Sequence, residues 1–445
     1  MQDLTTGPVT RHLLKTSSFM LVTMVVQTLY FLVDLYWVGH LGTTAVAAVG
    51  IAGNMTFIVL ALTQMLGVGT TTLVSHAAGR KDHEYGLLVF NQSQVLSMLA
   101  GVATLVVGLA TRRAYTASVG ADAATAAMAN AYLIWFIPAM ALQFAIVAMG
   151  AALRGLGQFK PGMVVSTSTI VLNMVLAPIL IFGWGTGHPL GVAGAAVATF
   201  ISIVVGVIWL TTYFFDKDSF LRFTPRDWTP QLGLWRKMLG IGLPSGLEFF
   251  LMAVYLFVVY SIIKPFGAEA QAGFGIGGRV VQAGFMPVVA LGFAVAPVAG
   301  QNVGAKLGLR VRETYKSAAV LAIVVMSLFA MFCRIAPGAL IGIFSSDPRV
   351  LNVGGEYLRI VAWSYVASGL IFVNSSMFQA LGNTMPSLVT SATRIVIVSV
   401  PAILLSQRPG FALREIWYLS VASVLVQLGF SLWLLRRELT KKLGA

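Results

Sequence analysis

Twelve apolar stretches follow one another along this sequence of 445 residues. Each is long enough to cross a lipid bilayer as a helix, which takes about 20 residues. Charged side chains make up only 10% of the chain, whereas soluble domains hold about 25%, so most of the surface is expected to face lipid. We predict an all-α polytopic membrane protein with twelve transmembrane helices near residues 14–38, 45–75, 87–110, 127–150, 162–183, 190–215, 239–263, 271–300, 317–333, 355–378, 386–405 and 415–435.

Lysine and arginine are unevenly divided between the loops on the two sides of these spans. With the N-terminus inside, the inner segments hold 19 of the 29 basic residues, the outer segments hold seven, and Arg279, Arg359 and Arg394 fall within spans. Basic residues in short loops stay on the cytoplasmic side. The sequence therefore predicts a bacterial-type inner-membrane protein with both termini in the cytoplasm. The same asymmetry accounts for the net charge of +14 without a nucleic-acid partner.

The first half of the sequence matches the second half without a gap at an offset of 225 residues. The matches include loop glycines, prolines and charged residues, which apolar composition does not explain. They pair Tyr30 with Tyr255, Gly42 with Gly267, Lys81 with Lys306, Asp122 with Asp347, and Pro161 with Pro386. We therefore expect six-helix lobes over residues 1–215 and 239–445. Because each lobe has an even number of spans, a pseudo-twofold axis along the membrane normal should relate them.

The two lobes are joined by a predicted cytoplasmic linker, residues 216–238, which is the longest charged stretch of the chain. Its tryptophans and basic residues are typical of segments that lie at the level of the lipid headgroups. A plain connecting segment is the alternative.

Asp34 and Glu248 are the only two acidic residues well inside the predicted spans. A charged side chain at mid-helix costs about 2.5–3.5 kcal/mol on insertion scales, and protonation would relieve most of that cost. A carboxyl that alternates between the two forms can exchange a proton for a cation. Helical spacing places Gln27, Tyr30 and Trp37 on the face of Asp34, and this face should line a cavity. The alternative is a carboxyl held permanently by hydrogen bonds between helices.

Glu248 shares a helical face with Met252 and Tyr255 in the seventh span. Tyr255 is the repeat partner of Tyr30, so we expect the first and seventh helices to face a shared centre. Glu248 also follows Pro244 by only four residues. Capping of a broken helix start is therefore an equal alternative to a role in binding the transported compound.

Asn173 in the fifth span is a further candidate for the cavity, on one face with Ser166 and Thr169. Polar groups of this kind also serve as hydrogen-bonding contacts between membrane helices. Arg394 lies about two turns beyond Pro386 in the eleventh span, and its long side chain is expected to snorkel toward the inner surface.

Motifs of soluble enzymes are incomplete in this sequence. The glycines of residues 273–278 fit the G-x-G-x-x-G pattern but open a span, without the strand–helix context of a dinucleotide site. Residues 300–306 are one residue short of a phosphate loop, and Leu307 stands where Ser or Thr would bind magnesium. Cys333 is the only cysteine. We expect no enzyme activity, no cofactor and no metal, and a transport process driven by an ion gradient.

Five segments together resemble the multidrug and toxic compound extrusion (MATE) family, and the resemblance extends over essentially the whole chain. They are VDLYWVGHLG (33–42), ALRGLGQFKPGM (152–163), GLPSGLE (242–248), PVAGQNVGAKLG (297–308) and FQALGNTMPS (378–387). The resemblance implies a V-shaped pair of six-helix bundles that exports cationic amphipathic compounds in exchange for protons or sodium. Asp34 is similar to the helix 1 carboxyl of the DinF-like branch, where it is the proposed proton site. By the same resemblance Asn173 lies near that site.

Departures from the family pattern favour protons over sodium. Many relatives carry a second carboxylate one turn after the helix 5 asparagine, where this chain has Ala177. The sodium-type branch has acidic residues on helices 7 and 10, and the tenth span here has Glu356 only at its outer start. The sequence thus predicts a proton-coupled multidrug antiporter whose partners are cationic amphipathic compounds, protons and membrane lipid. Sodium-coupled drug antiport and flipping of a lipid-linked saccharide are the alternatives.

Overall fold

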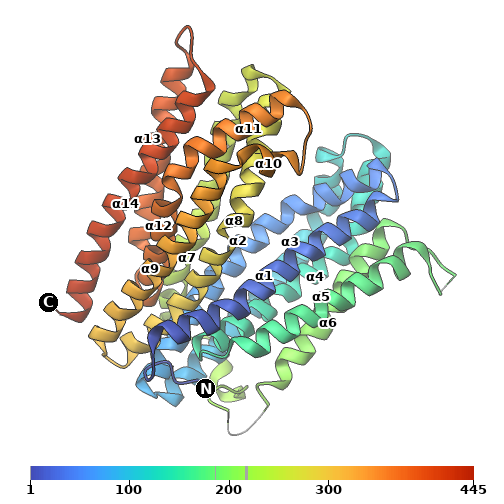
Figure 1. Ribbon diagram of the computed structural model, residues 1–445. Helices are drawn as coiled ribbons and strands as arrows, with labels where there is room; N and C mark the ends of the chain where they lie inside the picture. Colours follow the sequence, from blue (N-terminus) through green and yellow to red (C-terminus); the bar gives the residue numbers. More distant parts are fainter. Residues whose placement is uncertain (1, 186, 216–218, 445) are drawn as a thin grey trace. The chain divides into compact units, whose positions relative to one another are not determined.

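The computed structural model describes residues 2–185, 187–215 and 219–444, and the regular elements in these ranges are all helices (Figure 1). The elements are α1 (Val9–Gly39), α2 (Thr43–Arg80), α3 (His83–Val119), α4 (Ala123–Gly155), α5 (Phe159–Phe182), α6 (Val192–Thr212), η1 (Pro225–Trp228), α7 (Leu232–Ile263), η2 (Lys264–Phe266), α8 (Ala268–Gly304), α9 (Gly308–Ile335), α10 (Pro337–Gly342), α11 (Pro348–Val361), η3 (Ala362–Ser364), α12 (Tyr365–Ala380), α13 (Met385–Ser406) and α14 (Leu413–Leu443). Within the described residues, 12 helical segments are long and apolar enough to cross a membrane. The predicted all-α polytopic fold is confirmed.

Several helices extend beyond the apolar stretches that predicted them. α3 continues to Val119 and includes Arg112 and Arg113, which the sequence placed in a loop. The tenth predicted span is made of α11 and α12, which the 3-10 turn η3 separates, and α11 already begins at Pro348. Apolarity marks the part of a helix that meets lipid, whereas hydrogen bonding continues through polar residues outside it. The predicted spans therefore stop before the ends of the helices.

The chain divides into two compact units. The first contains Met1–Asp3 and Phe19–Gly242, and the second contains Leu4–Ser18 and Leu243–Ala445. This division differs from the predicted lobes at α1 and α7, because each of these helices contributes residues to both units. Of the predicted linker, residues 216–218 lie outside the described residues, and the remainder belongs to the first unit.

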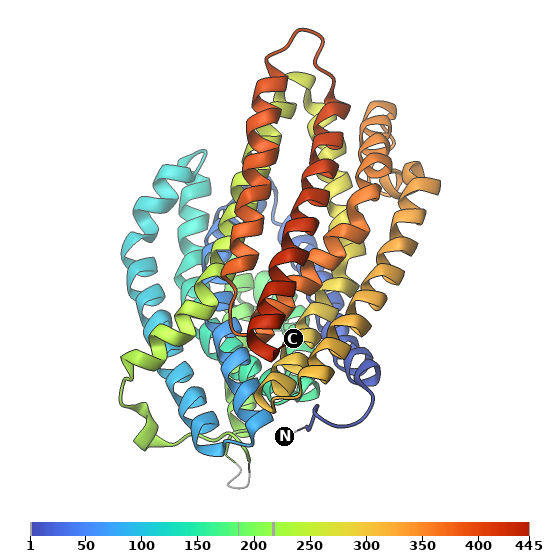
Figure 2. The same cartoon turned by 90° about the vertical axis from the view of Figure 1, so that its left-hand side faces the viewer.

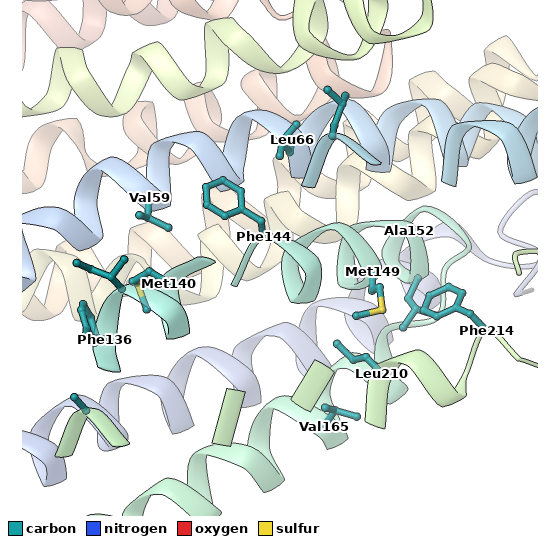
Figure 3. Close-up of a cluster of buried hydrophobic side chains, with 14 of the residues drawn as sticks. Val59, Leu66, Phe136, Met140, Phe144, Met149, Ala152, Val165, Leu210 and Phe214 are labelled. Carbon is teal, nitrogen blue, oxygen red and sulfur yellow. The ribbon is translucent and has the colours of Figure 1, made fainter. Parts of the chain in front are cut away.

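In the first unit, α4 packs against α2, α3 and α6. Val59 and Leu66 of α2, Phe144 and Met149 of α4, and Leu210 of α6 are buried in one apolar cluster (Figure 3). α4 is rich in alanine, and small residues let helix backbones approach closely inside a membrane. This composition explains why α4 occupies the centre of its unit.

In the second unit, α8 packs against α9, α11 and α12, while α13 and α14 form an antiparallel hairpin (Figure 2). The start of the chain completes this unit. Leu4 and Leu13 are fully buried in a cluster with apolar residues of α8, α9 and α12. The Leu4 amide donates a hydrogen bond to Gln301 Oε1 at 3.0 Å, and Arg310 Nη2 donates to the Gly7 carbonyl at 2.9 Å.

Two consecutive buried amides of α3, Asn91 and Gln92, hold the described part of the predicted linker against the first unit. Asn91 Oδ1 accepts hydrogen bonds from the Thr224 amide and from Trp228 Nε1, both at 2.9 Å. Gln92 Oε1 accepts one from Trp235 Nε1 at 2.7 Å. These two tryptophans therefore have protein partners, which the expected headgroup role did not include.

The repeat seen in the sequence is also present in the backbone. Lys81 and Lys306 follow α2 and α8 and are left-handed, with φ of 57° and 60°. They are the only non-glycine residues with positive φ in the described ranges. Gly42 and Gly267, just before α2 and α8, have φ of 100° and 95°, a region that glycine enters without steric cost. Repeat partners therefore end and begin their helices in the same way.

Candidate functional site

Asp34 lies on α1, five residues before the helix ends at Gly39, and belongs to the first unit. Its side chain is half-buried, and its Oδ1 atom is buried without a hydrogen-bond donor among the described residues. Tyr30 lies one turn earlier on the same helix. No Lys or Arg in the described ranges forms an ion pair with this carboxyl.

Thr199 on α6 links two of the predicted site residues. The Tyr30 hydroxyl lies 3.3 Å from Thr199 Oγ1, and Asn173 Nδ2 on α5 donates to the same oxygen at 3.1 Å. Thr199 Oγ1 itself donates to the Ala195 carbonyl at 3.1 Å. A hydroxyl has one proton to donate, so the Tyr30 hydroxyl must be the donor in its bond to Thr199. This network joins α1, α5 and α6 beside Asp34.

Two oxygen atoms near this network lack donors. Asp34 Oδ1 and Asn173 Oδ1 are both buried, and neither accepts a hydrogen bond from the residues that the structure describes. Asn173 is only 3% exposed, and buried acceptors normally have a partner. A proton on Asp34 would convert its carboxyl into a donor, and a small cation would be attracted to both oxygens. The described chain has no group of three or more His, Cys, Asp or Glu residues that suits a metal ion.

The other two predicted residues of α1, Trp37 and Gln27, do not take part in this hydrogen-bond network. Trp37 packs edge-on against Phe182 and Trp184, with ring centroids 6.1 Å and 5.7 Å away, and its Nε1 is buried without an acceptor among the described residues. Gln27 is exposed. That these four residues of α1 line one cavity stays a prediction.

Glu248 belongs to the second unit, on α7. Its Oε1 atom is buried without a donor in the described part of the chain. α7 passes through Pro244 without a break from Leu232 to Ile263. The expectation that Glu248 caps a broken helix start is therefore wrong, because no helix starts there. Met252, one turn further, is 54% exposed.

Tyr255 has a hydrogen-bonding arrangement like that of its repeat partner, Tyr30. Its hydroxyl lies 3.2 Å from Ser420 Oγ on α14, the last helix of its unit, as Tyr30 meets α6 in the first. The Arg394 guanidinium lies over the Tyr255 ring, 5.2 Å from its centroid. This position differs from the expected snorkelling toward the inner surface. That the helices of Tyr30 and Tyr255 face a shared centre stays a prediction.

Sequence reasoning missed Thr199. A lone threonine in an apolar helix usually bonds its own backbone, as Thr169 does through its 2.9 Å bond to the Val165 carbonyl. Nothing in the sequence distinguishes Thr199 from Thr169. Only the hydrogen bonds from Tyr30 of α1 and Asn173 of α5 show that it is the Thr199 hydroxyl that accepts from other helices.

Twelve candidate spans, an internal repeat and buried polar groups inside the spans define a polytopic membrane transporter. The MatE family model matches the chain twice, over residues 20–179 and 244–404, once in each half of the repeat. The chain belongs to the MATE family of transporters, and it is an integral, multi-pass membrane protein and not an enzyme.

Named relatives and solved structures cover nearly the whole chain. A probable multidrug resistance protein, YoeA of Bacillus subtilis (strain 168), is 27% identical over 403 residues, which are 89% of this chain and 87% of the relative. The multidrug export protein MepA of Staphylococcus aureus (strain MRSA252) is 26% identical, over 98% of this chain and 96% of the relative. The solved outward-facing conformation of a multidrug resistance MATE family transporter of the MOP superfamily has a TM-score of 0.90 at 26% identity, over 99% of this chain and 98% of that one.

Proposed function

We propose that this protein exports cationic amphipathic compounds in exchange for protons. Relatives named as multidrug resistance and multidrug export proteins support drug-like substrates. The observation that carries proton coupling is the buried Oδ1 of Asp34, which has no donor among the described residues. An ionised carboxylate inside a span is costly unless its negative charge is neutralised. At this position a proton or a cationic substrate would neutralise it. Tyr30, Trp37 and Gln27 on the same helical face offer aromatic and polar contacts to such a passenger.

In the proposed cycle, Asp34 takes up a proton when the transporter is open to the outside. The neutral carboxyl no longer attracts the cation, which leaves. When the transporter opens inward, the proton departs to the cytoplasm, and the restored carboxylate attracts the next cation. Exchange follows because the Asp34 carboxylate can be neutralised by a proton or by a cationic substrate, but not by both at once. The excess of basic residues in the inner loops supports an inner-membrane location with both termini in the cytoplasm.

The test is uptake of ethidium into inside-out vesicles with an acidic interior. The natural protein should accumulate the dye, and Asp34→Asn should abolish accumulation because Asn cannot release a proton. Asp122→Asn is the matched control, since it also removes a carboxylate, but at a helix start outside the spans. Undiminished ethidium uptake by Asp34→Asn would remove Asp34 from the coupling role.

Sodium coupling is the second candidate, because Asp34 Oδ1 and Asn173 Oδ1 are oxygen ligands of the kind that alkali cations bind. An experiment in liposomes that contain the purified protein distinguishes sodium coupling from proton coupling. Ethidium-stimulated proton release should persist when potassium replaces sodium. Release that requires sodium would favour the second candidate and overturn the first.

A further inference from the structure

A pocket of about 590 Å³ opens on the surface of the second unit, at the end where α9 finishes and α11 begins. Its lining comes from α9, α10, α11, η3 and α14, and α10 and α11 lie at the upper end of this unit in Figure 1. The volume falls within the range of about 300–1,000 Å³ that is usual for ligand pockets. The lining residues are different from those proposed above for proton or drug binding.

Three charged side chains line the pocket, and they are Arg334, Glu356 and Arg359. Arg334 is the last but one residue of α9, and the other two lie three residues apart on α11, a spacing that puts them on one face. Both arginines are exposed, and the glutamate is partly buried. The three ion pairs found in the described ranges all involve other residues. The pocket therefore offers a ligand two guanidinium groups and one carboxylate that are not engaged in ion pairs.

The helical repeat does not account for these charges. At the offset of 225 residues, their counterparts in the first unit are all apolar, namely Leu109, Ala131 and Ile134. The first unit forms its own six long helices without a charged group at these positions. The charged pocket is therefore a feature of the second unit and not a consequence of the repeat.

Aromatic and apolar side chains around the pocket indicate the level of the lipid headgroups. Trp363 and Tyr418 line it and are largely exposed, and these two residue types are enriched where a membrane meets water. The Arg334 guanidinium lies over the Trp363 ring, 4.1 Å from its centroid. Ile335, the last residue of the candidate span α9, is 75% exposed. An apolar side chain exposed in this way at the end of a span is suited to contact with acyl chains.

We propose that this pocket binds the headgroup of phosphatidylethanolamine, a zwitterionic lipid of the surrounding membrane. The guanidinium groups of Arg334 and Arg359 would donate hydrogen bonds to the lipid phosphate, whose geometry they match. The Glu356 carboxylate would accept hydrogen bonds from the ammonium group of the same lipid. The site goes beyond the proposed export function, because the lipid stays bound and is not carried across the membrane.

Charge complementarity selects this lipid over an anionic one. Phosphatidylethanolamine brings one phosphate and one ammonium group, which together match the charges of the pocket. Phosphatidylglycerol brings the phosphate but no cation, so its binding would leave Glu356 without a positive partner beside a second negative group.

The two lipids, prepared with identical acyl chains, test the proposal. Their dissociation constants for the purified full-length protein in detergent are measured by native mass spectrometry, and phosphatidylethanolamine should bind more tightly. Glu356→Gln should weaken the binding of phosphatidylethanolamine about tenfold, as expected for loss of a hydrogen-bonded charge pair, and should not weaken that of phosphatidylglycerol. Arg359→Gln removes a phosphate ligand and should weaken both lipids.

Arg349→Gln and Glu269→Gln are the matched controls. These two residues form an exposed ion pair at 3.4 Å, with Arg349 in the first turn of α11, and both lie outside the pocket lining. Each control removes one charge from the same unit and should bind both lipids as the natural protein does. Losses in the controls equal to those in the pocket variants, or unchanged phosphatidylethanolamine binding by Glu356→Gln or Arg359→Gln, would overturn the proposal. Should Arg359→Gln fail to fold, Arg334→Gln takes its place and should likewise weaken both lipids.

The free headgroup distinguishes a lipid site from a site for a soluble phosphate compound. Phosphoethanolamine lacks acyl chains, so it should displace phosphatidylethanolamine only at concentrations on the order of a hundredfold higher or more. Displacement at equal concentrations, or tighter binding of phosphatidylglycerol than of phosphatidylethanolamine by the natural protein, would overturn the assignment. Failure of the export function would leave these dissociation constants unchanged, so the two proposals are tested separately.

Discussion

The Asp122 carboxylate accepts a hydrogen bond from the Thr125 amide at 2.7 Å and so caps the start of α4. Asp347, its repeat partner, caps α11 in the same way through the Arg349 amide at 2.8 Å. The match between these two acids in the sequence therefore has a structural cause: each provides an acceptor to backbone amides that a helix start leaves unpaired.

This cap predicts a pH-dependent contribution to stability. The hydrogen bonds from Thr125 lower the pKa of Asp122 below its ordinary value. A lowered folded-state pKa means that the contribution is complete above about pH 4 and is lost as the pH falls through the lowered pKa. Asp122→Ala should therefore lower the melting temperature in detergent at pH 7, and the deficit should shrink in acid. Asp122→Asn, which keeps an acceptor, should show little deficit at pH 7. A deficit of Asp122→Ala that stays constant down to pH 3 would contradict this account.

Thr199 should matter to both stability and transport, because its hydroxyl receives hydrogen bonds from Tyr30 and Asn173. Thr199→Val keeps the shape and removes the hydroxyl, leaving two donors without an acceptor. We expect a loss of about 1–3 kcal/mol in the free energy of unfolding, together with slower ethidium uptake. Thr199→Ser retains the hydroxyl and is the control. Thermal unfolding in detergent and vesicle uptake measure the two effects, and equal behaviour of the Val and Ser variants would refute the role of the network.

Gln92 should determine whether the segment after α6 stays attached to the first unit. Its side chain is fully buried and donates to the carbonyls of Asp227 and Thr229. It accepts hydrogen bonds from the Gln231 amide at 3.0 Å and from Trp235 Nε1 at 2.7 Å. Gln92→Leu is expected to cost on the order of 3 kcal/mol, because several buried groups lose partners together. The released segment should become cleavable by trypsin at Arg226.

Gln94→Leu is the comparison for that experiment. Gln94 is also buried on α3, but its side chain donates a hydrogen bond to the neighbouring Ser93 Oγ at 3.2 Å and not to the segment after α6. It should keep the tryptic pattern of the natural protein. Identical protease resistance of Gln92→Leu and the natural protein would mean that the segment is held by other contacts.

The sequence alone was sufficient to predict features that depend on a single residue or on the constant spacing between the two repeats. Asp34 could be selected because an acid in an apolar helix is conspicuous, and the repeat could be found because loop glycines and caps recur at one spacing. The role of Thr199, and the partners of Asn91 and Gln92, depend on residues up to about 170 positions away that only packing brings near. Arg394 shows the same limit: its depth is readable from the sequence, but the direction of its side chain depends on Tyr255.

The assignment of the first and seventh helices to units was equally beyond the sequence. Hydropathy treats α1 as one span, yet Leu4–Ser18 belongs to the second unit, because Leu4 and Leu13 bury against residues of α8, α9 and α12. Periodicity within a helix describes its own faces. It carries no information on which neighbour covers them.

Gly242 is the last residue of the first unit, and it should be intolerant of any side chain. A Cβ atom there would overlap the backbone carbonyl of Met65, because α7 crosses α2 at this point. A backbone atom cannot move aside as a flexible side chain does, so Gly242→Ala should cost about 3 kcal/mol or more, at the upper end of overpacking effects. Gly240→Ala is the control on the same helix, since a Cβ there has no neighbour within 4 Å. Replacing that exposed helical glycine should be neutral or stabilise by up to about 1 kcal/mol. The two variants should therefore shift the melting temperature in opposite directions, and a Gly242→Ala protein as stable as Gly240→Ala would show that α2 and α7 do not cross this closely.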